Sequence, residues 1–356
     1  MQLAPAQLAS HLQRGLRSLY TLHGDETLLV QESADAIRAH ARALGYSERS
    51  VHTVAGAHFD WGAVLASGSS LSLFADKQMV EIRVPSGKPG KEGSAALQQV
   101  AELAQDNDST LTLVLLPRLD KATQSSAWFA ALENFGVTLR IEPVERAQLP
   151  AWIAQRLQAE GLRVQSGVEG QRTLQFFSDR VEGNLLAADQ EIRKLALLYP
   201  ASAEAPRELG FDEVEAAVLN VARYDVFKLA EAVLGGQVAR VQRMLAGLEA
   251  EGEAAVLVHW ALSEDIRGLK RVKDAVSAGR PLPMALRESR IWGVKERLYE
   301  RVLPRLSDTT LAQWLHAAHV VDGIVKGLRQ PEWPHDPWAA LQHLAMLVSQ
   351  ETKIAT

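Results

Sequence analysis

Strand-like and helix-like segments alternate over residues 19–141, and this alternation constrains the fold more than any other feature of the chain. Strand-like patterns predict strands at 19–22, 51–54, 79–84, 111–116 and 137–141, and helix-like patterns predict helices at 27–44, 61–67, 95–104 and 125–135. The run at 111–116 is apolar except for Thr112, which is typical of a strand buried on both faces. Strands separated by helices in this way predict a parallel sheet with helices on both faces, an α/β fold.

The pattern changes after residue 142, where strand signals fade and helical spacing dominates. Helices are predicted at 148–158, 170–180 and 184–198, followed by a linker at 199–210 that is rich in small residues and proline. Further amphipathic helices begin at 211 and 226 and continue towards residue 350. We therefore predict an α/β domain at 1–142, a small helical domain at 143–209 and an all-helical domain at 210–356, with a flexible polar loop at 87–93 inside the first.

The composition is that of a soluble globular protein. The chain has 356 residues, 47% of them hydrophobic and 23% charged, and no apolar run approaches the roughly 18 residues that a membrane helix needs. The first residues lack a basic region followed by an apolar core, so we expect no export signal. The absence of cysteine excludes disulfides, thiolate zinc sites and cysteine nucleophiles, and it fits a reducing cytoplasm.

The charge is distributed unevenly along the chain. The net charge of −5 does not suggest a free-standing DNA-binding protein, but residues 263–305 hold eleven Lys/Arg and six Asp/Glu, a local net of +5. A basic patch on an acidic protein can contact a polyanion locally. A helix surface of mixed charges explains the same counts, and a plain DNA-binding helical module is a further alternative.

The turn after the first predicted strand stands where a nucleotide-hydrolysing domain has its phosphate-binding loop. Such a loop needs several glycines, a lysine for the phosphates and a Ser/Thr for magnesium. The turn at 24–29 has one glycine, and Asp25 and Glu26 would repel a polyphosphate. The third and fourth strands run into Pro85 and Pro117 without the acidic residue that would hold magnesium. We expect no ATPase activity, and an active ATPase with a divergent phosphate loop remains the alternative.

Other catalytic arrangements are missing as well. No two of the ten histidines stand at i, i+4, so a helical zinc site is not expected, and we interpret His316 and His319 as ordinary helix-surface residues. Residues 68–70 lack the Gly-x-Ser-x-Gly frame of a nucleophile elbow, and Asp120 is predicted to be a turn or helix-cap residue. We expect no catalytic residue, no cofactor and no metal.

Two large apolar residues, Leu73 and Phe74, stand among small polar residues just before the third predicted strand. One interpretation is a helix end whose Leu and Phe fill the chain's own core. The other is an apolar plug for a pocket on another protein, because a few large anchors can carry most of the energy of an interface.

Short motifs follow one another along essentially the whole chain. They are Leu22-His23-Gly24-Asp25-Glu26 with Leu28-Leu29, Ser72-Leu73-Phe74, Ala127-Trp128-Phe129, Gln148-Leu149-Pro150-Ala151-Trp152-Ile153, Glu182-Gly183-Asn184-Leu185-Leu186-Ala187, Glu191-Ile192-Arg193-Lys194-Leu195 and Tyr224-Asp225-Val226-Phe227. In this order and at these intervals they resemble the delta-subunit family of the bacterial DNA polymerase III clamp loader.

The resemblance implies an AAA+-like α/β domain without a functional phosphate loop, a small helical lid domain and a helical collar domain. It implies a subunit of the DNA polymerase III holoenzyme, a DNA-directed DNA polymerase, that does not itself hydrolyse ATP. Leu73 and Phe74, supported by Leu71 and Met79, would bind a hydrophobic pocket on the ring-shaped sliding clamp, the beta subunit. The collar would join gamma/tau and delta prime subunits in a pentameric ring, with primer–template DNA as a further partner and no membrane.

The basic stretch falls within the expected collar. Its residues 290–295 resemble a family stretch that faces the primer–template, which makes Arg290, Trp292 and Lys295 candidate DNA contacts. An aromatic residue beside basic residues suits base stacking with phosphate contacts. Trp292 as a core residue between collar helices is the alternative. Trp333 lies in a proline-rich loop to which no role is assigned.

Overall fold

The computed structural model describes residues 1–56, 58–69, 76–105, 107–201, 205–218, 222 and 224–353. Contacts within the chain divide it into two compact units, Met1–Arg163 with Ala188–Glu208 and Val164–Ala187 with Leu209–Thr356. Two apolar clusters form the core of the first unit, and one large cluster forms that of the second. The division into three domains at residues 142 and 209 stays a prediction.

A six-stranded, wholly parallel sheet organises the first unit, and the five predicted strands are confirmed. The strand order is β1-β6-β2-β5-β4-β3, so β3 lies at one edge and the short β1, which the sequence did not predict, at the other. The central strands β2 and β5 are almost entirely buried, as their apolar runs require. The strands are β1 (Gln2–Leu3), β2 (Leu19–Gly24), β3 (Glu48–Thr53), β4 (Gln78–Arg83), β5 (Thr110–Leu116) and β6 (Val137–Ile141).

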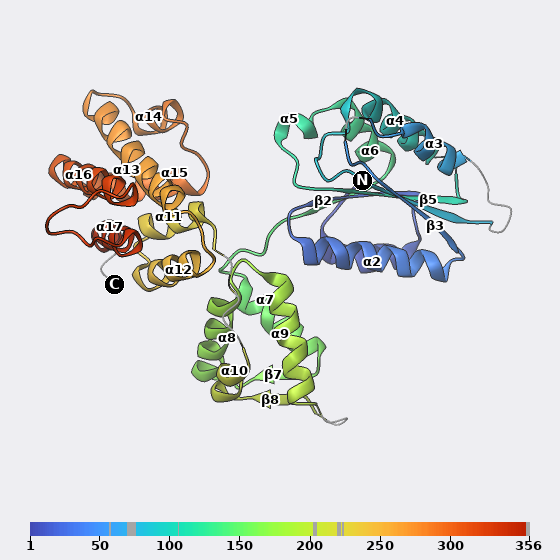
Figure 1. Cartoon of the computed structure of the whole chain (residues 1–356). Coiled ribbons are helices and arrows are strands. Elements are labelled where there is room, and N and C mark those ends of the chain that lie inside the picture. Colours follow the sequence, from blue (N-terminus) through green and yellow to red (C-terminus); the bar gives the residue numbers. More distant parts are fainter. Residues whose placement is uncertain are drawn as a thin grey trace. The chain divides into compact units, whose positions relative to one another are not determined.

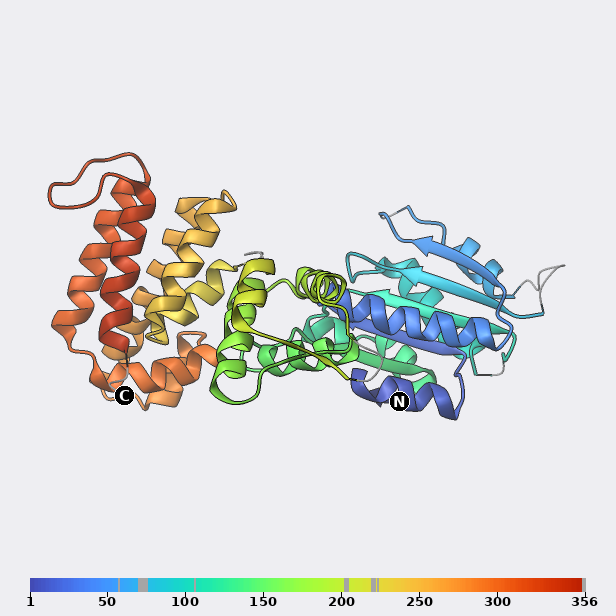
Figure 2. The same ribbon diagram turned by 90° about the horizontal axis from the view of Figure 1, so that it is seen from below.

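Helices cover both faces of this sheet, as predicted (Figure 1). On one face α1 (Leu8–Arg14), which follows the 3-10 turn η1 (Pro5–Gln7), lies beside α2 (Thr27–Ala43) (Figure 2). The other face carries α3 (Trp61–Ser69), α4 (Gly90–Leu103) and α6 (Ala127–Phe135). The short α5 (Lys121–Gln124) begins at Asp120, whose carboxylate accepts the Thr123 N–H at 2.7 Å, which confirms the predicted cap.

The flexible polar loop predicted at 87–93 is wrong in its second half, because α4 begins at Gly90. Gly93 is buried within this helix, and a Cβ atom built on it would lie 2.4 Å from Trp61 Cζ2. The glycine therefore permits the close approach of α3 and α4. The sequence pattern did not reveal that α4 begins here, because a glycine-rich sequence is also typical of a loop.

The middle of the chain holds helices and a small sheet. The linker predicted at 199–210 is wrong in part, since β8 within it pairs with β7 in a two-stranded sheet. These strands are three residues each, too short for an apolar alternation to be recognised. The elements are α7 (Leu149–Ala159), β7 (Leu162–Val164), α8 (Gly167–Val181), α9 (Leu185–Leu198), β8 (Arg207–Leu209) and α10 (Phe211–Ala217).

The remaining elements are helical, as predicted, and surround one large core in which Trp314 and Tyr299 are among the most buried side chains. Ser307 and Asp336 cap the last two helices by accepting backbone N–H groups in the first turn. Within the described part of the chain, no helix has the length and apolar character needed to cross a membrane. The elements are α11 (Val226–Leu234), α12 (Val238–Ala250), α13 (Ala255–Ser277), α14 (Leu282–Glu288), α15 (Val294–Val302), η2 (Leu303–Arg305), α16 (Asp308–Val325) and α17 (Pro337–Thr352).

Candidate functional site

The candidate clamp-binding segment connects α3 to β4. Leu71, Leu73 and Phe74 lie outside the described residues. Met79, predicted as a support, lies in β4 and is 3% exposed in the core on the α2 side of the sheet. A side chain this buried does not reach a partner, so Met79 anchors the strand that follows the segment rather than offering a contact surface.

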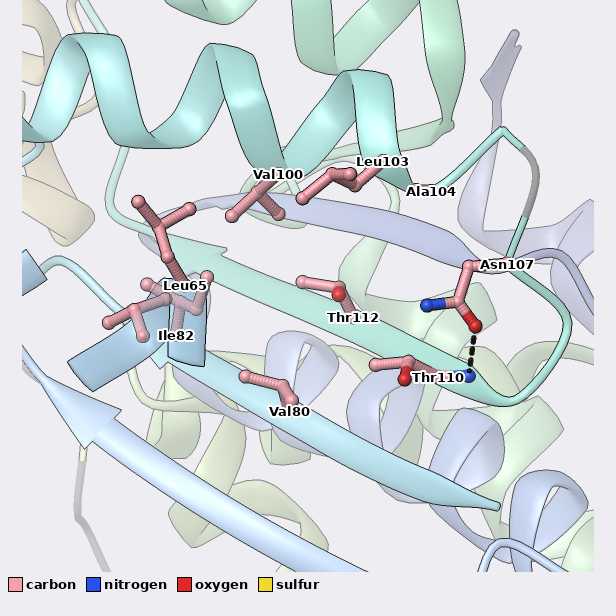
Figure 3. Close-up of a pocket in the computed structure, with 10 residues that line it drawn as sticks. Leu65, Val80, Ile82, Val100, Leu103, Ala104, Asn107, Thr110 and Thr112 are labelled. Carbon is pink, nitrogen blue, oxygen red and sulfur yellow. Dashed lines mark hydrogen bonds between the residues drawn. The ribbon is translucent and has the colours of Figure 1, made fainter. Parts of the chain in front are cut away.

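A small cavity lies near the same end of the sheet (Figure 3). Its lining comes from α3, α4 and the adjoining strands β4 and β5, with Leu65, Val100 and Thr112 among the lining residues. Its volume of about 20 Å³ leaves room for roughly one water molecule. The cavity is therefore a gap in the packing and too small to hold an organic ligand.

The turn between β2 and α2 stands where a phosphate loop would lie, at the carboxyl edge of the sheet. Asp25 Oδ1 accepts the backbone N–H of Arg118 at 3.0 Å, which ties this turn to the segment after β5. Gly24 lies so close to β6 that a Cβ atom would be 1.9 Å from the Ile141 carbonyl oxygen. The turn is thus held by a carboxylate and lies close against a neighbouring strand.

A cavity of about 470 Å³ adjoins this turn, and its charges are mixed. Its charged lining residues are Arg118, Lys121, Arg140, Asp25, Asp120 and Glu142. With three basic and three acidic side chains, the lining has no net formal charge. Among the described residues, no cluster of three or more His, Asp or Glu side chains is arranged to hold a metal ion.

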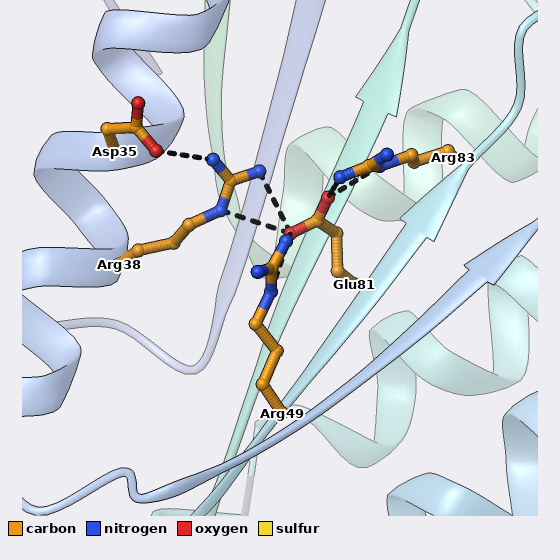
Figure 4. Close-up of polar contacts among 5 residues, drawn as sticks. All are labelled: Asp35, Arg38, Arg49, Glu81 and Arg83. Atoms are coloured by element: carbon orange, nitrogen blue, oxygen red, sulfur yellow. Dashed lines mark hydrogen bonds and ion pairs between the residues drawn. The ribbon is translucent and has the colours of Figure 1, made fainter.

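Three arginines surround the carboxylate of Glu81 on the α2 side of the sheet (Figure 4). Arg38 from α2 and Arg49 from β3 donate to Oε2, at 2.9 and 2.7 Å, and Arg83 donates to Oε1 at 2.6 Å. Burial alone raises the pKa of Glu81, but the hydrogen bonds from the arginines outweigh burial and hold this pKa below its usual value. We refer to Arg38, Arg49 and Arg83 as the arginine cluster.

The sequence analysis missed the arginine cluster, although a signal was present. Glu81 and Arg83 alternate with Val80 and Ile82 in a strand that was predicted to lie inside the sheet. Two charged residues on one face of a buried strand require partners on the covering elements. The register of the sheet decides which residues of α2 and β3 are these partners. No pattern within the strand determines that register.

The candidate DNA contacts lie in the segment that follows α14 and in the first turn of α15. Trp292 is 62% exposed, so the alternative of a core residue is wrong. Arg290 is exposed and has a positive φ of 57°, which places it at a sharp turn. Lys295 instead pairs with the buried Asp265, its Nζ lying 2.6 Å from Oδ1. Burial raises the pKa of Asp265, while the hydrogen bond from Lys295 opposes that effect.

The surrounding basic stretch is only partly available to a polyanion. Lys270 and Arg271 pair with acidic residues of the same helix, as the mixed-charge alternative anticipated. Arg287, Arg290 and Arg297 are exposed and have no ion-pair partner within the described residues. These three arginines therefore lie on both sides of Trp292 in the sequence.

Comparison with known proteins identifies the family. A family model described as DNA polymerase III, delta subunit, matches residues 20–142. The DNA polymerase III subunit delta of Escherichia coli K12 is 31% identical over 348 residues, which cover 98% of this chain and 96% of that protein. The chain belongs to the DNA polymerase III delta subunit family. The corresponding Haemophilus influenzae subunit delta is 24% identical over 355 residues, covering 97% of this chain and 98% of that protein.

A solved structure agrees with this assignment at the level of the fold. The Bacillus subtilis DNA clamp loader delta protein aligns with a TM-score of 0.51 and 16% identity, covering 97% of this chain and 99% of that one. The resemblance inferred from the motifs is confirmed: the chain is an AAA+-like clamp-loader subunit of DNA replication. Its partners accordingly include other members of the clamp-loader complex.

Proposed function

We propose that this delta-family chain is a non-catalytic, cytoplasmic subunit that binds the sliding clamp and opens the ring for loading onto primed DNA. The observation that carries the proposal is family membership over 98% of the chain. The contact is the apolar plug formed by Leu73 and Phe74, with Leu71 beside them. The plug segment is joined to two well-packed elements, α3 and β4, which provide a rigid base for it.

Ring opening follows from differential affinity. A protein that binds one face of a closed ring, and binds better when one ring interface is open, shifts the ring towards the open state by the difference in binding free energy. Burial of a Leu and a Phe supplies about 3–6 kcal/mol before the costs of ordering are subtracted. A contact of this size is compatible with reversible binding.

The work of ATP hydrolysis would then fall to other subunits, the gamma/tau motors of a pentameric loader that also contains delta prime. The absence of a phosphate loop and the acidic residues at the β2–α2 turn support a chain without ATPase activity. An active ATPase with a divergent loop is the alternative. Titration of the isolated chain with labelled ATP separates the two, since tight magnesium-dependent binding would favour the ATPase.

Primer–template DNA is the further partner that we propose for the assembled complex. Trp292 and Arg290 would contact it directly, through base stacking and a phosphate contact. Lys295, through its ion pair with Asp265, would hold the start of α15 in place. The helical collar would join this chain to the neighbouring subunits.

The direct test is the affinity of the purified chain for the beta clamp. Replacing Leu73 and Phe74 together by Ala removes the plug, and we expect the dissociation constant to rise about 100-fold or more. Leu197 and Leu198 form a matched control, since both are exposed at 84% and 56% and are also adjacent and apolar. Their double Ala variant should bind the clamp like the unchanged chain.

The thermal midpoint of both variants should stay close to that of the unchanged chain. Loss of the fold in the plug variant would instead support the alternative in which Leu73 and Phe74 fill the chain's own core. An unchanged clamp affinity of a folded plug variant would contradict the proposal.

A further inference from the structure

The strand β3 leaves one edge of the parallel sheet open, and the proposed function does not use this edge. β3 stands at the end of the strand order and pairs only with β4. The N–H of Val54, directly after β3, donates to the Arg83 carbonyl oxygen of β4 at 2.8 Å. The backbone groups of consecutive residues in a strand point to opposite sides. Those of Arg49, Val51 and Thr53 therefore point away from β4.

These outward groups form an unpaired hydrogen-bonding edge. Within the described residues, the three N–H groups and three carbonyl groups have no hydrogen-bond partner. A row of unpaired groups of this kind accepts a further extended segment, which joins the sheet as a new strand. A helix satisfies its own backbone groups and does not offer donors and acceptors at this spacing. The occupant that matches the edge is therefore an extended peptide segment.

The side chains along the edge indicate which sequence such a segment needs. Arg49, Val51 and Thr53 share the face of the sheet on the α2 side, because alternate residues of a strand point to the same face. Val51 is 44% exposed and the Arg49 side chain is 42% exposed. An added strand places one of its side chains beside each of these residues. An apolar side chain suits Val51, and a carboxylate suits Arg49.

Arg49 has a donor to spare for that carboxylate (Figure 4). It binds Glu81 through Nε and Nη2, and its Nη1 has no partner within the described residues. Glu81 is buried and fixes the guanidinium group in place. The arginine cluster, with Glu81 and Asp35 as its two carboxylates, keeps a surplus of one positive charge. A second carboxylate, supplied by a partner, would balance that charge.

A second copy of this chain fits the edge less well than an acidic segment does. The residues that a second β3 would bring to the same edge, Arg49, Val51 and Thr53, include no carboxylate. Such pairing would add another guanidinium group and leave the charge surplus larger. The charges thus favour a different protein as the partner.

We propose that the open edge of β3 binds an extended segment of a partner protein by strand addition, with a carboxylate beside Arg49 and an apolar residue beside Val51. This interaction is separate from clamp binding through the plug, because the edge and the plug share no residue.

The test is fluorescence anisotropy of the full chain with a labelled peptide, Thr-Glu-Thr-Val-Thr-Glu-Thr, which reads the same in both directions. We expect saturable binding. The same sequence with every backbone amide N-methylated keeps the charges but cannot pair with a strand, and it should not bind. A peptide with Lys in place of both Glu residues should bind at least about tenfold more weakly, because it lacks the carboxylate for Arg49.

The Val51→Pro variant tests the backbone edge directly. The Val51 N–H points away from β4, so proline removes no hydrogen bond of the sheet while it blocks the approach of a new strand. Peptide binding should weaken at least about tenfold, and circular dichroism checks that the fold persists.

The Arg49→Gln variant tests the charge. It should weaken binding of the acidic peptide about tenfold, the effect of losing one charge-assisted contact. Arg42→Gln is the matched control, since Arg42 is exposed, lies in α2 and loses the same charge away from the edge. It should bind the peptide like the unchanged chain.

Three results would overturn the proposal: no saturable peptide binding, equal binding by folded Val51→Pro, or equal binding of the N-methylated peptide. Self-association of the chain that Val51→Pro abolishes would identify a second copy as the occupant and would overturn it as well. The proposal and clamp binding can fail separately. The Leu73→Ala/Phe74→Ala variant should still bind the peptide, and Val51→Pro should still bind the clamp.

Discussion

Glu81 is a charged residue in the middle of a sheet, and its side chain is 0% exposed. An uncompensated carboxylate at this place would cost several kcal/mol, so the arginine cluster is a condition for folding as well as a surface feature. The pKa of Glu81 is lower in the folded chain than in the unfolded chain, where it is near 4.5. The Glu81 carboxylate therefore stabilises the fold above pH 4.5, and this contribution is lost as the pH falls through the folded-state pKa.

We expect Glu81→Gln to lower the free energy of unfolding by about 2 kcal/mol or more at pH 7, because it leaves three arginines without their carboxylate. The difference from the unchanged chain should shrink as the pH falls from 4.5 through the lowered folded-state pKa of Glu81, because the native carboxylate then becomes protonated as well. Urea unfolding at several pH values measures this. Glu142→Gln is the control, because its pair with Arg140 is about half exposed and should contribute less than about 1 kcal/mol. A difference that does not depend on pH would contradict the assignment of the effect to charge.

Trp292 is a second residue with a separable prediction. In an assembled clamp loader, Trp292→Ala should weaken binding of primed DNA about tenfold, the effect of losing one stacked base. Trp292→Phe should restore most of that affinity, since it keeps an aromatic face. Fluorescence anisotropy with labelled primer–template measures both, and equal DNA affinity of the Ala variant would remove Trp292 from the interface.

Most elements of the sheet could be predicted from sequence, because central strands such as β5 are apolar runs and the helices show apolar residues at helical spacing. The failures have physical causes. β1 has two residues, too few for any pattern, and β7 and β8 have three each. The start of α4 was mistaken for a loop because it holds two glycines. One of them, Gly93, makes room for the ring of Trp61, and a sequence pattern does not reveal that role.

The contact between Gly93 and Trp61 makes a testable prediction about these two helices. In a helix, Gly→Ala normally stabilises by about 0.5–1 kcal/mol, but a Cβ on Gly93 would lie 2.4 Å from Trp61. Overpacking of this kind costs about 1–3 kcal/mol, so Gly93→Ala should destabilise on balance. Gly323→Ala in α16 is the control and should stabilise, since its nearest neighbour would be at 3.4 Å. If urea unfolding showed that both variants change the free energy of unfolding in the same direction, this would contradict the packing argument.

At the scale of the whole molecule, the order of patterns along the chain predicted the parallel α/β unit, the helical remainder and the family. The plug, the arginines and Trp292 belong to different parts of the chain, so no local pattern relates them. The plug is a prediction that rests on the family resemblance alone, because two apolar residues before a strand are also typical of a core. Of the three residues predicted to contact DNA, Trp292 and Arg290 are exposed, whereas Lys295 has a buried partner that lies 30 residues away in the sequence. Their contact with DNA stays a prediction.

Release of a clamp from circular DNA measures ring opening itself. Purified chain is added, without ATP or other subunits, to labelled beta clamp loaded on a nicked circular plasmid, and the clamp that leaves the DNA is followed over time. The account predicts that this chain accelerates release and that the Leu73→Ala/Phe74→Ala variant does not. Release that requires ATP, or that proceeds equally fast with the plug variant, would contradict it.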